Sequence, residues 1–178
     1  MSEQPVFGDR YRLLWYPAKE GRIGEVRNYT TNRMGFRLVP VMLDDELMQR
    51  ISMRYLATSW NNLGPQIIAS RAFTTLPQNF KDAGIWHEMG HVHHEHHLRA
   101  DFEDQAQLRA ARIAAVKEKR VILLETEADM FAVSRAGKEK FIGFLTHVLE
   151  TRPLGGTLSW NDLGRRELEL RIKAIQAL

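Results

Sequence analysis

The sequence predicts an α+β fold in which a small, partly antiparallel sheet comes first and a helical half follows. Two patterns lead to this prediction. Between residues 11 and 43, short apolar stretches alternate with Gly, Asn and Pro, as strands joined by turns do. From Asn79 onward, apolar residues recur at helical spacing, and the clearest breaks are Gly137 and segment 153–156, which holds one Pro and two Gly.

The length of the chain favours one domain. Its 178 residues lie in the usual size range of a compact domain, and 44% of them are hydrophobic, which is enough to form a core. We therefore expect a single domain over residues 1–178. Its sheet-rich part would span residues 1–77 and its helical part residues 78–178.

The sheet-rich part is expected to contain strands at 11–16, 24–29 and 36–43. Asp44 and Asp45 can cap a helix, whose apolar residues then recur at helical spacing up to Trp60. Segment 66–76, which precedes Pro77, is expected to hold one or two further strands. Helices are expected at 79–97, at 100–136 with a possible break, at 138–150 and at 160–178.

Charge and composition restrict the kind of protein. The formal charge of +3 comes from 25 basic and 22 acidic residues spread along the chain, so we expect no nucleic-acid partner. Cysteine is absent, so any metal must be bound by nitrogen and oxygen ligands. Residues 1–12 lack a signal-peptide pattern, and no run approaches the ~20 apolar residues that span a bilayer. We expect a soluble, cytoplasmic protein with no membrane partner; its oligomeric state stays open.

Residues 87–91 form an HExxH motif with the sequence His-Glu-Met-Gly-His. Residues four apart share one face of a helix, so the imidazoles of His87 and His91 can converge on one zinc ion at ~2.0–2.1 Å. Glu88 follows the first ligand directly and is suited to act as general base toward a zinc-activated water. Gly90 would permit close approach of another backbone or side chain.

A second segment can supply the third protein ligand that a catalytic zinc site needs. Glu125 and Asp129 are four residues apart and share a helical face with the small residues Ala128 and Ala132. We assign Glu125 as the third ligand and Asp129 as the acceptor of the free N–H of a ligand histidine. Glu127 is expected to point away from that face. The alternative is a solvated acidic helix start.

An HExGH helix followed by an ExEAD helix resembles the gluzincin metallopeptidases, in particular the catalytic domain of the CAAX-prenyl-protease-like family and the soluble minigluzincins. The resemblance covers about residue 67 to the C-terminus. It implies a zincin-like fold, one zinc ion with Glu125 as a ligand, and hydrolysis of a peptide or protein substrate. The ImmA/IrrE-type peptidases are a second, weaker resemblance, because they usually carry Asn where Asp129 stands here.

The closing helix also resembles this family, in which an Arg, here Arg171, follows a His-Pro pair. The pair is missing from this chain, and its His would fall near Arg165. Arg165, Arg166 and His147 are therefore the candidates for stabilising the oxyanion. In the family the substrate lies along an edge strand beside the metal helix, which here would fall within residues 67–76.

We therefore expect a zinc-dependent endopeptidase in which a zinc-activated water attacks the peptide bond and Glu88 is the general base. The alternative is a latent enzyme, with the C-terminal helix across its cleft, or a non-catalytic zinc-binding scaffold or regulatory domain. A third possibility is metal buffering by a second ion at His93, His94, His96 and His97. That run is otherwise a solvated helix end. The cleavage preference stays open.

Overall fold

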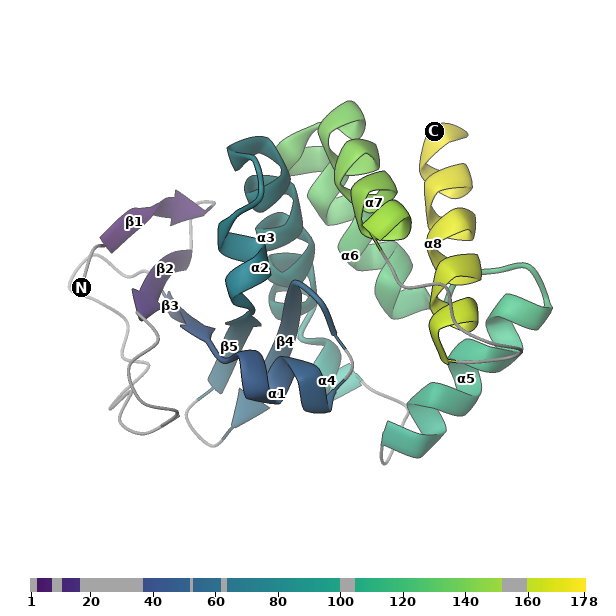
Figure 1. The fold of residues 1–178 in the computed structure, drawn as a ribbon, viewed down its shortest axis with the longest axis horizontal. Coiled ribbons are helices and arrows are strands. Elements are labelled where there is room, and N and C mark those ends of the chain that lie inside the picture. The colour runs from purple at the N-terminus through teal and green to yellow at the C-terminus, as the bar shows by residue number, and fades with distance from the viewer. Residues whose placement is uncertain are drawn as a thin grey trace. The chain divides into compact units, whose positions relative to one another are not determined.

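The computed structural model describes residues 3–7, 11–16, 37–51, 53–61, 64–99, 105–151 and 160–178 (Figure 1). The chain divides into two compact units, Met1–Pro77 and Gln78–Leu178. The first unit contains the sheet and the second is helical, so the α+β class and the order of its two parts are confirmed. A single domain spanning both units stays a prediction.

The first unit contains a five-stranded mixed sheet in the order β1-β2-β3-β5-β4. Its strands are β1 (Glu3–Phe7), β2 (Tyr11–Tyr16), β3 (Arg37–Leu43), β4 (Leu56–Asn61) and β5 (Gly64–Ala69). The two outer pairs, β1 with β2 and β4 with β5, are antiparallel. The inner pairs are parallel. The expected partly antiparallel sheet is therefore present.

The helix expected to run up to Trp60 is much shorter. Helix α1 (Asp45–Arg50) is followed by β4, whose Leu56 pairs with Ala69 of β5. The prediction was wrong because pairing with β5 overrides the helical spacing of the apolar residues, and Thr58 and Trp60 suit a strand. Strand β1 was also not predicted, and the strand expected at 24–29 lies outside the described residues.

The start of α1 follows the prediction. The Asp44 carboxylate accepts a hydrogen bond of 2.8 Å from the Leu47 backbone N–H, which satisfies a free donor of the first turn. This cap places Met48 on the inner face, where it packs with Met42 and Ile68 in a buried cluster. Helix α1 therefore covers the ends of β3 and β5.

Segment 66–76 is only partly a strand. After β5, the Ser70 hydroxyl accepts a hydrogen bond of 3.2 Å from the Phe73 N–H and begins the short helix α2 (Arg71–Thr74). Strand β5 pairs with β3 on one side and with β4 on the other. The expectation of a substrate-binding edge strand within 67–76 is therefore wrong. Of the described strands, β1 and β4 lie at the edges, where an added peptide strand can pair.

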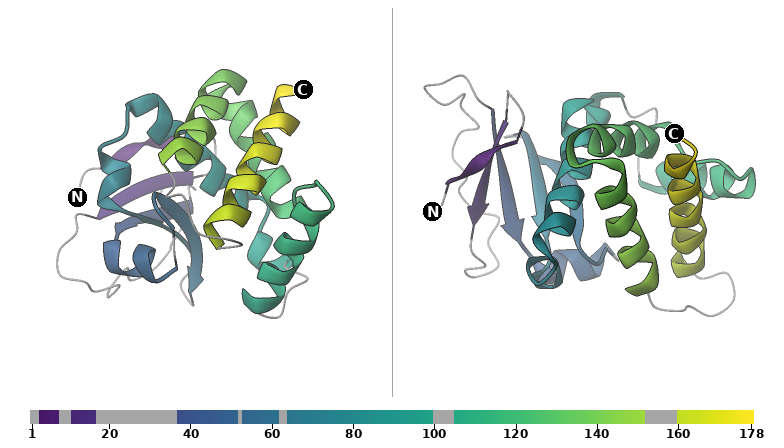
Figure 2. Two further views of the ribbon diagram at one scale, coloured as in Figure 1. Left: turned by 45° about the vertical axis from the view of Figure 1, so that its right-hand side comes forward. Right: turned by 90° about the horizontal axis from the view of Figure 1, so that it is seen from above.

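The second unit consists of helices, which Figure 2 shows from two sides. They are α3 (Gln78–His93), α4 (His96–Arg99), α5 (Gln105–Lys117), α6 (Leu123–Ala136), α7 (Lys138–Thr151) and α8 (Trp160–Gln176). Helix α3 packs mainly against α6 and also against α7, while α8 packs against α5, α6 and α7. The helices expected at 79–97 and 100–136 are each divided in two. Gly137, with φ 94°, ends α6 as predicted.

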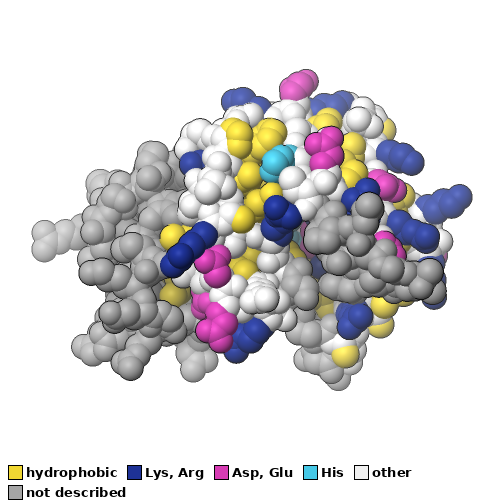
Figure 3. Space-filling model, viewed as in Figure 1, with side chains coloured by type: hydrophobic (Ala, Val, Ile, Leu, Met, Phe, Trp, Pro, Cys, Tyr) yellow, Lys and Arg dark blue, Asp and Glu magenta, His cyan; other side chains and the backbone are white. Residues whose placement is uncertain are grey.

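Basic and acidic side chains are interspersed on the face shown in Figure 3. No helix in the described part of the chain combines the length and apolar character that crossing a membrane requires.

Candidate metal centre

Close packing of α3 against α6 forms the centre. A Cβ atom added to Gly90 would lie 2.7 Å from the Ala128 Cα and 3.0 Å from its carbonyl oxygen, so glycine is required for this contact. Ala128 and Ala132 are fully buried. This approach brings the side chains on one face of α6 against the HExxH residues of α3, as the sequence predicted.

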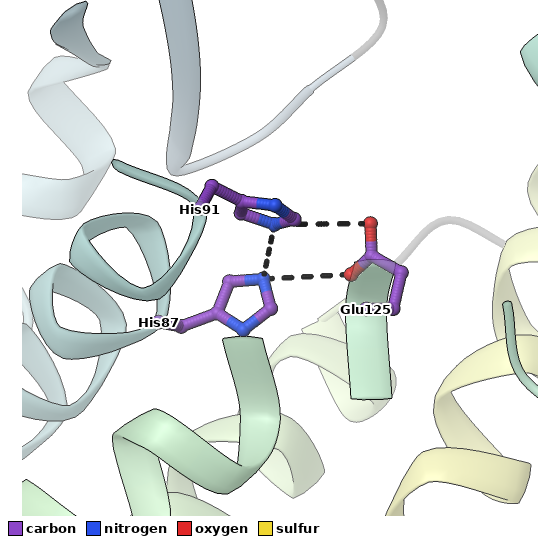
Figure 4. A group of neighbouring side chains, drawn as sticks. All are labelled: His87, His91 and Glu125. Carbon is purple, nitrogen blue, oxygen red and sulfur yellow. Dashed lines mark hydrogen bonds and ion pairs between the residues drawn. The ribbon is translucent and has the colours of Figure 1, made fainter. Parts of the chain in front are cut away.

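Three donor side chains converge between the two helices (Figure 4). The Nε2 atoms of His87 and His91 are 3.3 Å apart. Glu125 places Oε2 3.4 Å from the His87 Nε2 and Oε1 4.0 Å from the His91 Nε2. Donors of a tetrahedral zinc site with bonds of ~2.0–2.1 Å lie about 3.3–3.4 Å apart. The His87–His91 and His87–Glu125 distances match this spacing, whereas Glu125 approaches His91 less closely and through its other oxygen.

This set is the one group of three or more His, Cys, Asp or Glu among the described residues that could hold a metal ion. It combines two imidazoles with one carboxylate, which is a donor set of catalytic zinc sites. Glu88 follows His87 on α3 and is 7% exposed. The structure thus brings together the three predicted ligands, with the predicted general base next to one of them in the chain.

The outer nitrogen of His87 contacts Asp129, as predicted. His87 Nδ1 lies 2.9 Å from the Asp129 Oδ1. When this nitrogen donates its proton to the carboxylate, the lone pair of the neutral imidazole is on Nε2, which faces the other donors. Asp129 can therefore fix the ring and the tautomer of His87.

Arg171 of α8 is a component of the centre that the sequence analysis did not place there. Its Nη1 lies 3.1 Å from the Glu125 Oε2, and its Nε donates to the Asp129 Oδ2 over 2.8 Å. The guanidinium is buried. A signal exists in the sequence, because Leu168, Arg171 and Ile175 share one helical face and the other two are apolar core residues.

A second arginine approaches from α5. Arg112 forms a bidentate pair with the buried Glu167 of α8, with contacts of 3.1 and 2.6 Å, and its Nη2 lies 3.7 Å from the Glu125 Oε1. Two guanidinium groups therefore face three carboxylates, those of Glu125, Asp129 and Glu167. This leaves one negative charge, which either a protonated His87 or a bound cation can balance.

The two histidines differ in protonation. Burial and the charge of Arg171 lower the pKa of His87, but hydrogen bonds to Asp129 and Glu125 outweigh both and raise it to about 9. Burial lowers the pKa of His91 to about 3. At neutral pH and without metal, His87 is therefore protonated and His91 is neutral.

The carboxylates of the centre are ionised. Burial alone would raise the pKa of Glu125, but Arg171 and Arg112 hold it well below its usual range. Burial is likewise outweighed at Asp129, where Arg171 and His87 lower the pKa. Both groups therefore carry the negative charge that metal binding and orientation of His87 need.

The histidine run behaves differently from a uniformly solvated helix end. His93 and His97 are exposed, as that interpretation expects, but His96 is only 4% exposed. Its Nδ1 lies 2.7 Å from the His91 Nδ1, and its Nε2 lies 2.9 Å from the Glu127 Oε2. Glu127 therefore belongs to the surroundings of the centre. No second metal group occurs in the described part of the chain.

Comparison with protein-family models, curated proteins and solved structures found no match. The zincin-like fold and the gluzincin family therefore remain predictions from the two motifs.

The three candidates for stabilising an oxyanion have different surroundings. Arg165 donates to the Leu149 carbonyl over 2.9 Å, Arg166 is exposed, and the ring of His147 packs 5.5 Å from that of Phe80. None of these contacts selects one of the three, so the role stays unassigned.

Proposed function

We propose that this protein is a zinc-dependent endopeptidase of the gluzincin type, with one zinc ion held by His87, His91 and Glu125. The observation that carries the proposal is the convergence of their donor atoms, because two of the three distances, 3.3 and 3.4 Å, have the spacing of a tetrahedral site. Two helices supply these donors, and the contacts of Gly90 with Ala128 hold those helices together.

The donor set favours zinc over other common ions. Magnesium and calcium prefer oxygen ligands in larger numbers, whereas two imidazoles and one carboxylate suit zinc and leave a coordination position for a substrate or water. When bound, zinc supplies a Lewis acid that polarises a carbonyl group and lowers the pKa of a water molecule.

Glu88 would move the proton in the reaction. Its carboxylate accepts a proton from the attacking water as the oxygen bonds to the carbonyl carbon of the peptide. It then passes that proton to the amine nitrogen as the C–N bond breaks, which yields one new carboxyl group and one new amine. The burial of Glu88 in α3 supports this role, because a shielded carboxylate beside a metal ligand exchanges protons with the substrate rather than with bulk water.

The latent form considered from the sequence can now be revised. Helix α8 carries Arg171 into contact with Glu125 and Asp129, and it buries Leu168 and Ile175. We expect removal of residues after 153 to destroy the centre, because the truncation leaves two buried carboxylates without their cation. If α8 instead blocked the cleft of a latent enzyme, the same truncation would raise activity.

The proposal is tested by measuring metal content and peptide cleavage together. Native mass spectrometry and a quenched peptide library are applied to wild type, Glu88→Gln, Glu125→Ala and the exposed control Glu139→Gln. We expect one zinc ion and cleavage for wild type and control. Glu88→Gln should keep zinc but lose activity by at least about 100-fold, in line with loss of a general base. Glu125→Ala should lose zinc.

Two outcomes would contradict the proposal in different ways. A wild-type protein that binds one zinc ion but cleaves no peptide would support the non-catalytic zinc-binding scaffold instead. Zinc binding that survives Glu125→Ala unchanged would show that the ion lies elsewhere.

A further inference from the structure

The outer nitrogen of His91 faces a histidine rather than a carboxylate or a backbone carbonyl. His91 Nδ1 and His96 Nδ1 are 2.7 Å apart, and the two rings meet edge to face with centroids separated by 4.9 Å. On its far side, His96 Nε2 lies 2.9 Å from the Glu127 Oε2. One line of contacts therefore runs from α6 through α4 to the candidate ligand on α3.

A break in the helix makes this contact possible. In a continuous helix, a residue five positions after His91 would lie about 140° around the axis, because each residue turns by ~100°. Here α3 ends at His93, and Glu95 adopts a left-handed conformation with φ 52°. The Glu95 N–H bonds to the Val92 carbonyl over 3.2 Å, which closes the turn. Helix α4 begins directly after this turn at His96, which lies buried against His91.

The proton positions follow from the two contacts. A neutral His91 whose Nε2 binds a metal carries its proton on Nδ1, so it must donate to the His96 Nδ1. His96 accepts at Nδ1 only when its own proton is on Nε2. That proton is donated to the Glu127 carboxylate. A carboxylate at position 127 therefore selects the tautomer of His96, and His96 in turn selects the tautomer of His91 in which Nε2 can bind metal.

We propose that His96 and Glu127 are positioning residues for His91, acting as a two-step relay of hydrogen bonds behind the metal ligand. This inference rests on the proposed metal centre. The relay fixes both the orientation of the His91 ring and the nitrogen that is free to bind the ion. Neither residue touches a substrate in this role.

The relay is distinguished from simple packing by its need for an acceptor. An apolar side chain at position 96 would fill space but would leave the Nδ1–H of the half-buried His91 without its His96 partner. The side-chain oxygen of Asn can occupy the position of the His96 Nδ1. His96→Asn can therefore keep the hydrogen-bond acceptor for His91, although the shorter side chain cannot reach Glu127. The comparison of His96→Leu with His96→Asn therefore separates hydrogen bonding from volume.

Zinc affinity is measured by competition with a chromogenic chelator at pH 7.5. We expect His96→Leu to bind zinc about 10- to 100-fold more weakly than wild type, as loss of an outer contact of a ligand histidine does. His96→Asn should recover most of that loss. Glu127→Ala should weaken binding less than His96→Leu. The control His97→Leu removes an exposed imidazole and should not change the affinity for zinc.

Nitrogen NMR of the zinc-loaded, ¹⁵N-histidine-labelled protein reads the proton positions directly. We expect His91 to carry its proton on Nδ1 and His96 to carry its proton on Nε2. In Glu127→Ala, the His96 signal should shift toward a mixture of tautomers. A rescued affinity in His96→Asn without any change in the His91 tautomer signal would support the same relay.

The outcomes separate this inference from the proposed function. If wild type binds no zinc, the proposed centre fails and the relay with it. If wild type binds zinc and His96→Leu binds equally well, the relay is overturned while the centre stands. A proton on Nδ1 of His96 in the zinc-loaded protein would also overturn it, as would equal losses in His96→Leu and His96→Asn.

Discussion

The two candidate ligand histidines of α3 have very different surroundings. His87 faces Asp129, whose carboxylate is paired with the buried Arg171 of α8. His91 faces His96, which contacts the half-buried Glu127. The first arrangement joins fully buried charges from different helices, whereas the second uses an imidazole and lies nearer the surface.

This difference separates stability from metal binding. A buried ion pair is strongly destabilised when one partner is removed, because the other charge remains without compensation. Loss of a neutral hydrogen-bond acceptor has a smaller effect on folding. We therefore expect the surroundings of His87 to control both folding and zinc affinity, and those of His91 to control mainly zinc affinity.

The largest effect is expected from Arg171→Met. It leaves Glu125 and Asp129 buried without their guanidinium partner, which should lower the free energy of unfolding of the zinc-free protein by about 3–5 kcal/mol. Urea denaturation measures this change. Arg166→Met, on an exposed position of the same helix, should stay within about 0.5 kcal/mol of wild type. If His96→Leu destabilised the zinc-free protein as much as Arg171→Met does, the comparison would be broken.

The free energy of unfolding of the zinc-free protein should depend on pH through the protonation of both His87 and His91. His87, with a pKa of about 9 against 6.5 unfolded, stabilises the fold below pH 6.5, and this contribution of about 3 kcal/mol is lost as the pH rises through 9. His91, with a pKa of about 3, instead destabilises the fold as the pH falls below 6.5. Stability should therefore be greatest near pH 6.5.

Urea denaturation at several pH values tests this profile, and His87→Gln provides the control. That variant should lose the decline between pH 6.5 and 9 while keeping the decline at acidic pH. A wild-type profile that rises steadily up to pH 9 would contradict the protonated state of His87.

A smaller effect is expected from Gly90→Ala, which acts on both histidines at once. The new methyl group would meet the backbone of Ala128 and force α3 and α6 apart, at about 1–3 kcal/mol of stability. In Gly143→Ala the nearest atom is the Phe80 ring, 3.1 Å away. That ring can shift, and alanine favours a helix by about 1 kcal/mol over glycine, so this control should change stability little. Thermal unfolding of the two variants makes the comparison.

The sequence predicted that His87, His91, Glu125 and Asp129 form one group because each pair shares a helical face and because a zinc site with two His ligands needs a third donor. His87 and His91, like Glu125 and Asp129, are four residues apart, and both pairs lie on uninterrupted stretches of helix. The cap at Asp44 was predictable for a similar reason, since it depends on a local hydrogen bond. Local periodicity thus accounts for which residues share a face in each helix, while the packing of α3 against α6 brings the two faces together.

Features that depend on tertiary contacts or on unusual backbone geometry were missed. Strand β4 follows a helical apolar pattern but pairs with β5, and no local signal shows that partner. Arg171 lies in a different helix from the residues it contacts. His96 comes into contact with His91 only because Glu95 adopts a left-handed conformation. A glutamate in a sequence does not predict this conformation, since positive φ is uncommon for residues other than glycine.

The turn at Glu95 also governs which changes in chain length this region can accept. Four residues separate His91 from His96, and one of them, Glu95, has a positive φ, so the contact depends on the number of intervening residues as much as on their chemistry. Deletion of one residue at the turn would bring His97 to the position of His96, whereas an insertion would bring Glu95 there in place of a histidine. The exposed histidines of segment 93–97 should therefore tolerate substitution. A change in the number of residues in this segment should disrupt the contact between His91 and His96.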